Sequence, residues 1–415
     1  MKKHLLLIFL VWLGVCLLGA APYYFSGYIP NFTDAVFESV SGFTTTGATL
    51  LADVEALPCW LLFWRALTNW LGGMGIVLFS ATILPLLETG GFQLHKAGTS
   101  GPDNEKIVLR ISLAARILLL LYISLTALQV LLLFFFGMNW FDAITHAFST
   151  MSTGGFSTRN ASIAYYNSPA IEWVCVVFMF LAGFNLFLVW RLLQGKARDV
   201  MRNSEARAYA GIILAAAVII TIAILPQGPS LEAALRKALF QAASLLSTCG
   251  LFSADFNHWP SVAQGALFFL LFIGGCSGST AGGIKVIRYV ILSKQTWNEM
   301  KRIVYPRGVF NIMLDGRSGK KDMVYGVAGF VFLYFVILFF TALLVSSSGA
   351  DVFTSLNTAL ICQGNIGLGL GNQRPANVFP GFPAYVKWGL SLVMIMGRLE
   401  LWTVLVLFTG DFWRK

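Results

Sequence analysis

Four short stretches rich in glycine, serine and threonine interrupt the long apolar runs of this chain. Each stretch follows an amphiphilic segment that is too short to cross a bilayer, since a crossing takes roughly 20 helical residues. The recurring unit is therefore a helix, a half-length helix, a glycine-bearing loop and a second helix. Four such units divide the chain into residues 1–90, 91–195, 196–300 and 301–415. The stretches are "SGFTTTGATLL" from Ser41, "MSTGGFSTRN" from Met151, "LSTCGLFSAD" from Leu246 and "CQGNIGLGLG" from Cys362, and their glycines Gly47, Gly154, Gly250 and Gly367 are 107, 96 and 117 residues apart.

The apolar runs between these stretches indicate a membrane protein. The sequence is 57% hydrophobic and only 12% charged, well below the roughly 25% charge of a soluble globular domain. We predict an all-α integral membrane fold with eight crossings, in which four pseudo-fourfold repeats of helix, re-entrant half-helix with loop, and helix surround one ion pore. The apolar runs lie near residues 5–25, 58–87, 108–136, 169–193, 206–226, 259–273 with 284–292, 323–346 and 379–409.

Basic residues are distributed unevenly among the segments that connect these runs. With a cytoplasmic N-terminus, most of the 29 lysines and arginines fall in inner segments, while Arg398 lies inside an apolar run. This is the positive-inside pattern, so we expect both termini in the cytoplasm. The net charge of +10 then reports topology and not a nucleic-acid partner. The predicted outer segments contain Arg65, Arg159, Arg236, Lys237, Arg374 and Lys387.

The first apolar run admits a second interpretation. A basic start, an apolar middle and small residues near Ala20 also fit a cleaved signal peptide. Cleavage would remove the leading helix of the first repeat, so we favour a retained helix. The six cysteines show no metal-site spacing, and we predict neither a disulfide framework nor a zinc site.

The glycine-bearing loops are constrained by their depth in the membrane. Non-helical backbone is tolerated there only where protein buries it or where it lines a water-filled cavity. Four such loops around one axis would form a cavity, and each half-helix would direct its partially negative C-terminal end toward that axis. Carbonyl groups next to glycine can replace the hydration shell of a cation, as in K⁺ channels. Close helix packing by small residues is the alternative, and the fourfold recurrence disfavours it.

Five ordered motifs resemble the signatures of the Trk/Ktr/HKT potassium transporter superfamily, closest to its bacterial TrkH type. The resemblance implies potassium uptake across the bacterial cytoplasmic (inner) membrane, with K⁺ as the transported ion and no cofactor in this chain. It also implies a homodimer with one pore per protomer and a cytoplasmic nucleotide-binding ring partner of the TrkA or KtrA type. The motifs are "SGFTTTGATLL", "FWRALTNWLGGMGI" from Phe63, "HAFSTMSTGGFST" from His146, "GGCSGSTAGGIK" from Gly274 and "MGRLELWTVLVLFTGDFWR" from Met396.

The resemblance assigns a selectivity filter to Gly47, Gly154, Gly250 and Gly367. Plant relatives with a preference for Na⁺ have serine at the first filter glycine, so Gly47 favours K⁺. Two features depart from the family pattern. We expect no counterpart of the extra N-terminal helix pair seen in many TrkH members, which leaves the expected pore intact. The fourth loop reads Gly-Asn-Ile-Gly-Leu where a proline often follows the glycine, and this weakens the expectation of strict K⁺ over Na⁺ selection. Further carbonyl or hydroxyl oxygens are expected from Thr45, Thr46, Ser152, Thr153, Thr248, Cys249, Asn365 and Ile366.

The sixth apolar run is interrupted by "GGCSGSTAGGIK" at residues 274–285. A helix loses roughly 1 kcal/mol for each interior glycine relative to alanine, so the run should break. A mobile obstruction beneath the filter is expected, as the resemblance also implies, and a static kink is the alternative. A phosphate-binding loop is excluded because no Gly-Lys-Ser/Thr sequence ends the motif. The expected gate residues are Gly274, Gly275, Gly278, Ser279, Thr280, Gly282 and Gly283, together with Arg398.

Arg398 lies in an apolar run, where an unpaired charge costs about 2.5 to 17 kcal/mol, so it must face protein or water. The resemblance suggests that it points into the cavity below the filter and slows conduction. An ion pair is the alternative, although Glu400, two positions further on, would face away on a continuous helix.

The remaining charged residues carry weaker signals. The basic inner segments 191–207 and 285–321 either dock an acidic partner or anionic headgroups, or reflect topology alone. His95, His146 and His258 show no ligand spacing. The outer acidic residues either concentrate cations at the entrance or form a solvated face. They are Asp34, Glu38, Asp53, Glu55, Asp142 and Asp255.

Two other classes compete with a channel-like transporter. An enzyme would need paired carboxylates, a Ser/His pair or a metal cluster at membrane depth, and the sequence has none, so we predict no enzymatic activity. A secondary transporter usually has twofold inverted repeats, whereas the repeat here is fourfold. Coupled symport of Na⁺ and K⁺, or of H⁺ and a cation, through the same fold is the alternative function.

Overall fold

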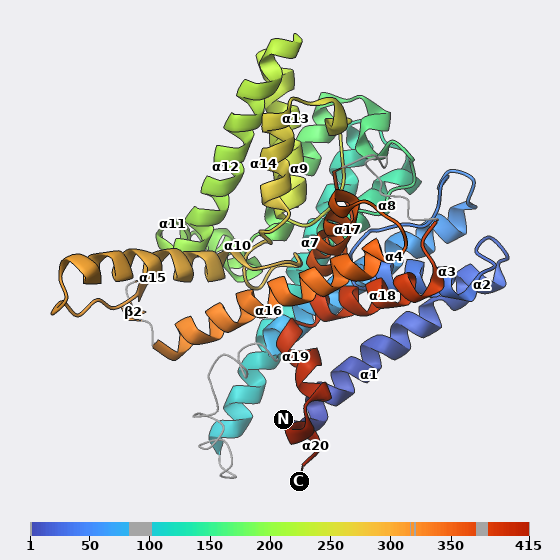
Figure 1. The fold of residues 1–415 in the computed structure, drawn as a ribbon. Coiled ribbons are helices and arrows are strands. Elements are labelled where there is room, and N and C mark those ends of the chain that lie inside the picture. The colour runs from blue at the N-terminus through green and yellow to red at the C-terminus, as the bar shows by residue number, and fades with distance from the viewer. Residues whose placement is uncertain (1, 83–101, 316, 319–320, 371–380, 415) are drawn as a thin grey trace.

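The structure is a computed structural model, and it describes the chain except residues 1, 83–101, 316, 319–320, 371–380 and 415 (Figure 1). The regular secondary structure of the described residues is helical, apart from the two-residue strands β1 (Met313–Leu314) and β2 (Arg317–Ser318). The long helices are α1 (Lys2–Gly19), α4 (Cys59–Thr82), α7 (Pro102–Phe135), α9 (Pro169–Gly183), α12 (Ser204–Ile224), α15 (Val286–Val304), α16 (Lys321–Ser346) and α18 (Ala384–Arg398). The shorter helices include α2 (Ala21–Phe25), α10 (Leu186–Leu193), α11 (Ala197–Arg202), α14 (Ser261–Leu270), α19 (Leu401–Leu405) and α20 (Gly410–Trp413).

The chain is an all-helical membrane protein with several apolar spans. Among the described residues, five helices are long and apolar enough to cross a membrane. Two further pairs pass the same test together but are bent, by 109° between α9 and α10 and by 117° between α18 and the segment Leu401–Phe408. The expected sixth crossing is represented by the short apolar helix α14 and a non-helical continuation. The eight predicted runs therefore correspond to five straight spans, two bent pairs and one interrupted run.

Four half-length helices lie at matching places in the chain. Each begins at a polar residue whose side chain accepts a hydrogen bond from a backbone N–H of the first turn, which satisfies one of the donors left free at a helix start. The capping residues are Asn31, Asn139, Ser230 and Asp351. The half-length helices are α3 (Phe32–Phe43), α8 (Trp140–Met151), α13 (Leu231–Leu246) and α17 (Val352–Gly364).

The half-length helices pack in a closed order. Helix α3 contacts α4 and also α18 from the last repeat, α8 contacts α7 and α4, and α13 contacts α12 and α9. Helix α17 packs on α16 and α18, and its Phe353 ring lies 5.7 Å from the Phe268 ring of α14. Each half-length helix thus contacts a helix of its own expected repeat and a helix of the expected repeat before it, and α3 with α18 closes the order.

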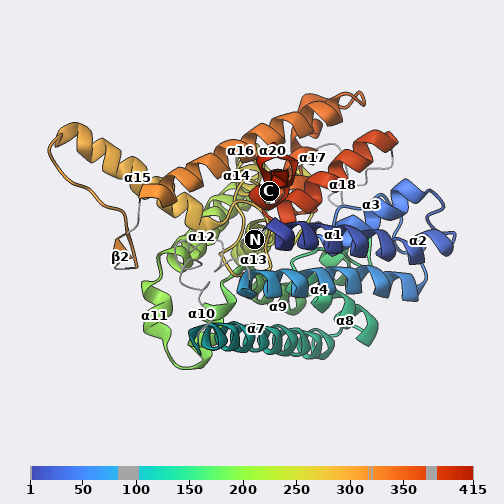
Figure 2. The same cartoon turned by 90° about the horizontal axis from the view of Figure 1, so that it is seen from below.

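The two ends of the described chain lie side by side (Figures 1 and 2). The Lys2 ammonium donates to the carbonyl oxygens of Asp411, at 2.9 Å, and Arg414, at 2.7 Å. Leu5, Leu407 and Phe412 form a small buried cluster next to these bonds. Both ends are therefore on one side of the molecule, whereas α15 projects away from the helices around the centre.

Candidate functional site

The four glycine-bearing loops meet in a ring. Each loop places one glycine so close to a main-chain carbonyl of the next loop that a side chain would not fit. A Cβ atom on Gly47 would lie 2.1 Å from the carbonyl oxygen of Gly154. The corresponding distance from Gly250 to the carbonyl oxygen of Ile366 is 2.2 Å. The ring is completed by Gly155 against the carbonyl of Cys249, at 2.1 Å, and by Gly367 against that of Thr46, at 2.2 Å.

The backbone angles of the loops show that Gly155, and not the expected Gly154, is the structural equivalent of Gly47. Each loop has a left-handed residue two positions before a left-handed glycine, and in the second loop that glycine is Gly155 and not Gly154. Gly154 instead occupies the place of Thr46 in the first loop. Two consecutive glycines make the sequence alignment ambiguous by one residue, and only φ resolves it. The left-handed pairs are Thr45 and Gly47 (φ 51° and 77°), Thr153 and Gly155 (57° and 74°), Thr248 and Gly250 (57° and 77°), and Asn365 and Gly367 (52° and 72°).

Three of these left-handed residues are threonines. A β-branched residue at positive φ is a genuine outlier, and such strain, of order 1–3 kcal/mol, persists only where the surroundings enforce it. The Thr153 hydroxyl donates to the carbonyl of Thr280 at 2.9 Å, and the Thr248 hydroxyl accepts from the backbone N–H of Gly282 at 2.7 Å. The Asn365 amide donates to the Thr46 hydroxyl at 2.9 Å and to the Met394 carbonyl at 3.0 Å. The other expected loop residues, Ser152, Cys249 and Ile366, are fully buried beside them.

The glycines of the ring line one cavity. The term outer face is used for the side of the molecule on which the half-length helices begin, because the expected topology places that side opposite the cytoplasm. The cavity is lined by Gly47, Gly155, Gly250 and Gly367, and its wall includes Thr49, Arg65, Phe156, Arg159 and Asn160. The four loops therefore converge at one place, as the sequence predicts.

The interrupted segment at residues 274–283 folds back on itself. Ile273 and Ile284 form a parallel bridge, and the Gly274 N–H donates to the Ile284 carbonyl at 2.9 Å. A Cβ atom on Gly274 would lie 2.1 Å from the Gly282 carbonyl oxygen, and one on Gly282 would lie 2.4 Å from the Gly364 carbonyl oxygen. The glycines thus allow both the fold of the segment and its contact with the fourth loop.

The same segment is fastened at the bend between α9 and α10. The backbone N–H of Cys276 donates to the Gly183 carbonyl at 2.8 Å, and that of Leu186 donates to the Gly278 carbonyl at 3.3 Å. The carboxylate of Glu205, on α12, accepts from the Ser277 N–H at 2.6 Å. The remaining expected gate residues, Gly275, Ser279 and Gly283, lie in the same folded segment. The segment therefore lies directly against three loops of the ring, through Thr153, Thr248 and Gly364.

Arg398 is buried next to this segment. Its guanidinium donates to the Thr280 carbonyl at 2.7 Å and to the Gly72 carbonyl at 3.4 Å. The Thr280 carbonyl thus accepts from both Arg398 and the loop residue Thr153. Glu400 does face away from Arg398, but the expected reason, its position on a continuous helix, is wrong. The helix ends at Arg398, Glu400 has φ of 67°, and its carboxylate pairs with Arg288 at 2.7 Å.

Ion pairs around the half-length helices were not predicted. Glu38 of α3 is fully buried and pairs with Arg65 of α4 at 2.8 Å. Its carboxylate also accepts from Thr49 and from the Leu50 N–H, just beyond the first loop. Glu38 is therefore not part of a solvated outer face. The other pairs are Asp34 with Lys387 at 2.6 Å, Asp142 with Arg159 at 3.2 Å, and Glu172 with Arg236 at 2.7 Å.

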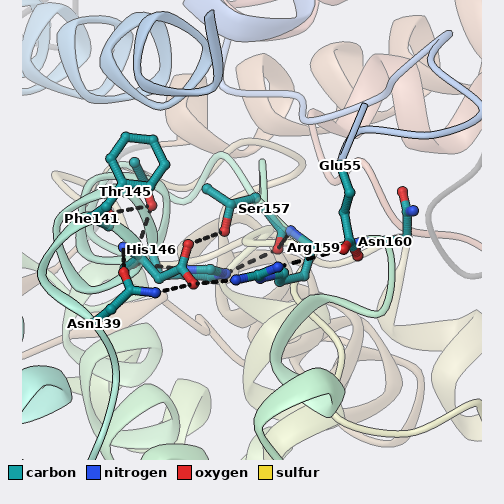
Figure 3. Close-up of polar contacts among 10 residues, drawn as sticks. Glu55, Asn139, Phe141, Thr145, His146, Ser157, Arg159 and Asn160 are labelled. Atoms are coloured by element: carbon teal, nitrogen blue, oxygen red, sulfur yellow. Dashed lines mark hydrogen bonds and ion pairs between the residues drawn. The ribbon is translucent and has the colours of Figure 1, made fainter. Parts of the chain in front are cut away.

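The histidines differ in their surroundings. His146 is fully buried, and its ring nitrogens lie 2.8 Å from the Asp142 carbonyl and 3.0 Å from the Ser157 hydroxyl (Figure 3). His258 is exposed and lies 3.5 Å from Asp255. His95 and Arg374 lie outside the described residues. Among those that are described, no group of three or more His, Cys, Asp or Glu side chains could hold a metal ion.

These features define a helical, multi-pass membrane protein in which four half-length helices and their glycine-bearing loops converge on one centre. The sequence profile of the TrkH family, described as a cation transport protein, matches residues 2–226 and 225–415. The chain belongs to the TrkH cation transport family.

Relatives of known name cover nearly the whole chain. It is 39% identical over 420 residues to the Trk system potassium uptake protein TrkH of Salmonella typhimurium, covering 100% of this chain and 86% of that protein. It is 34% identical over 408 residues to the Trk system potassium uptake protein TrkI of Halomonas elongata, covering 98% and 83%. The crystal structure of the potassium transporter TrkH from Vibrio parahaemolyticus matches with a TM-score of 0.90 at 35% identity, covering 100% of this chain and 86% of that one.

Proposed function

We propose that this chain takes up potassium ions across the bacterial cytoplasmic membrane through a single selective pore. The observation that carries the proposal is the ring of four loops around one cavity, in which each left-handed glycine contacts a carbonyl group of the next loop. Membership of the TrkH family and the potassium uptake activity named for its relatives support the same function.

In this proposal the filter consists of main-chain oxygens in the four loops. Carbonyl dipoles can replace the water around an alkali cation, and the half-length helices end at the loops with their partially negative termini. Glycine at position 47 favours K⁺ over Na⁺. The proposed filter residues are Thr45, Thr46, Gly47, Ser152, Thr153, Gly154, Gly155, Thr248, Cys249, Gly250, Asn365, Ile366 and Gly367.

The segment at residues 274–283 acts as the gate in this proposal, and Arg398 holds it. The support is the shared Thr280 carbonyl, which accepts hydrogen bonds from both Thr153 and Arg398. A positive charge below a cation filter raises the barrier to conduction, and the segment lies directly against three of the four loops. Opening then requires the Arg398 and loop contacts of this segment to break.

The assembly is proposed to be a homodimer with both termini in the cytoplasm and a nucleotide-binding ring of the TrkA or KtrA type as its regulator. The adjacent chain ends and the basic inner segments support a common cytoplasmic side. The projecting helix α15 carries Lys294, Lys301 and Arg302, which suit an acidic partner surface.

Growth of a bacterium that lacks K⁺ uptake tests the proposal. The intact chain, expressed with its regulatory ring protein, should restore growth on limiting K⁺, and Gly47→Ser or Gly250→Ser should weaken that rescue or admit Na⁺. Rescue that is indifferent to both substitutions would contradict the proposed filter. Reversal potentials in K⁺ gradients, measured with and without gradients of H⁺ or Na⁺, separate passive flow from the alternative of coupled symport.

A further inference from the structure

Arg159 lies at the outer mouth of the proposed cation pathway. It follows the second loop and lines the same cavity as the four ring glycines. Arg65 lines that cavity too, but its side chain is 2% exposed and it pairs with a fully buried carboxylate. The Arg159 side chain is 27% exposed. A cation that approaches the ring therefore passes a positive charge that is open to solvent.

Two carboxylates pair with this guanidinium through different nitrogens, and Figure 3 shows Glu55 beside Arg159. Asp142 of α8 lies 3.2 Å from Nη2, and Glu55, from the segment between α3 and α4, lies 3.5 Å from Nη1. The guanidinium carbon is 4.3 Å from the centre of the Tyr165 ring, a distance at which a cation is attracted to an aromatic face. Arg159 thus joins the first repeat to the second at the mouth of the cavity.

The two carboxylates are not equivalent. Asp142 is 3% exposed and also accepts from the Thr158 hydroxyl at 2.6 Å and the Asn139 amide at 3.0 Å. Burial opposes its ionisation, but the hydrogen bond from Thr158 and the nearby positive charges outweigh burial and hold the pKa of Asp142 below its usual value. Glu55 is 37% exposed and accepts from the Asn160 N–H at 3.0 Å. Asp142 is therefore the fixed anchor of Arg159, and Glu55 is its solvent-facing partner.

We propose that Arg159 sets the affinity with which the outer mouth collects cations, by engaging Glu55 and Asp142 so that neither carboxylate is free to attract an incoming ion. The three side chains together carry one negative charge. Neutralising Arg159 makes the mouth more negative and raises the local cation concentration, and neutralising Glu55 does the opposite. This inference rests on the proposed cation uptake, and the sign of each change follows from charge alone.

Rubidium uptake into vesicles tests this inference. The KM for Rb⁺ is measured at low ionic strength, with the salt of a large organic cation as the background electrolyte. We expect Arg159→Gln to lower the KM and Glu55→Gln to raise it, each by about two- to fivefold. The double variant Arg159→Gln with Glu55→Gln should return toward the wild-type KM, and Arg159→Lys should shift it less than Arg159→Gln does. The KM shifts of both single variants should shrink when the salt is raised to about 0.15 M, because the Debye length is then roughly 8 Å.

A matched control is Arg116→Gln, which removes one exposed positive charge far from the mouth and should leave the KM unchanged. A purely structural role for Arg159 would move both single variants in the same direction, or would give shifts that persist at high salt, and either result overturns the inference. If Arg159→Gln does not reach the membrane, Glu55→Gln at the exposed carboxylate still tests the inference, because an unchanged or lowered KM in that variant contradicts the inference. Failure of the wild-type chain to take up Rb⁺ would instead refute the proposed function.

Discussion

The ring of loops predicts that a single methyl group at Gly250 disables uptake. The φ of Gly250 is 77°, and an L-residue in this left-handed region costs about 1–2 kcal/mol. In Gly250→Ala the new Cβ would also lie 2.2 Å from the Ile366 carbonyl oxygen, so that this carbonyl must move by about 1 Å to restore van der Waals contact. Overpacking of this kind costs about 1–3 kcal/mol, which corresponds to roughly a five- to 150-fold loss of the native loop geometry.

Gly195 provides the matched control for this substitution. Its φ is also 77°, but a Cβ atom there would meet nothing within 4 Å. Gly195→Ala therefore has the same backbone cost without moving a carbonyl of the ring. Rubidium uptake, normalised to the protein found in the membrane, should fall by about tenfold or more in Gly250→Ala and should stay near wild type in Gly195→Ala. Equal uptake by the two variants would refute the role assigned to the Ile366 carbonyl.

Three further predictions follow from other parts of the structure. Arg398→Gln should increase K⁺ flux several-fold because it removes both a charge and the hydrogen bond to the Thr280 carbonyl; unchanged or lower flux at normal expression in patch recordings would count against the gate. Glu38→Gln should lower the melting temperature of the purified protein far more than Glu299→Gln does. Breaking a buried pair costs about 3–5 kcal/mol, whereas the Glu299 pair with Arg302 is exposed. Similar losses of melting temperature would show that the buried pair has no special role. A variant with only the exposed Cys59 should react with an impermeant maleimide from the outer face, and labelling restricted to the inner face would reverse the topology.

Much of the architecture was accessible from the sequence because it depends on local signals. The apolar runs and the amphiphilic segments have different lengths, and the glycine-bearing loops recur at matching places. We did not predict the polar residues that cap the half-length helices, Asn31, Asn139, Ser230 and Asp351, although their residue types are typical of a helix start. Side-chain capping of this kind acts within a single turn, so it leaves a short local pattern.

The features that escaped prediction depend on distant contacts or on φ. Glu38 and Arg65 are separated in sequence and pair only because α3 packs on α4. The choice between Gly154 and Gly155 required the backbone angle. The sharp bend after Arg398 occurs without a proline, since Glu400 adopts a left-handed conformation and pairs with Arg288. Each of these results from tertiary structure and not from residue type.

The most direct test of the central claim is to locate the bound ion. Crystals of the protein grown in Rb⁺ or Tl⁺ would show anomalous scattering at any site that the ion occupies. We predict a peak at the centre of the ring, in direct contact with main-chain oxygens from all four loops, which would replace the water around the ion. A peak elsewhere, or an empty ring in a preparation that still takes up the ion, would contradict the account.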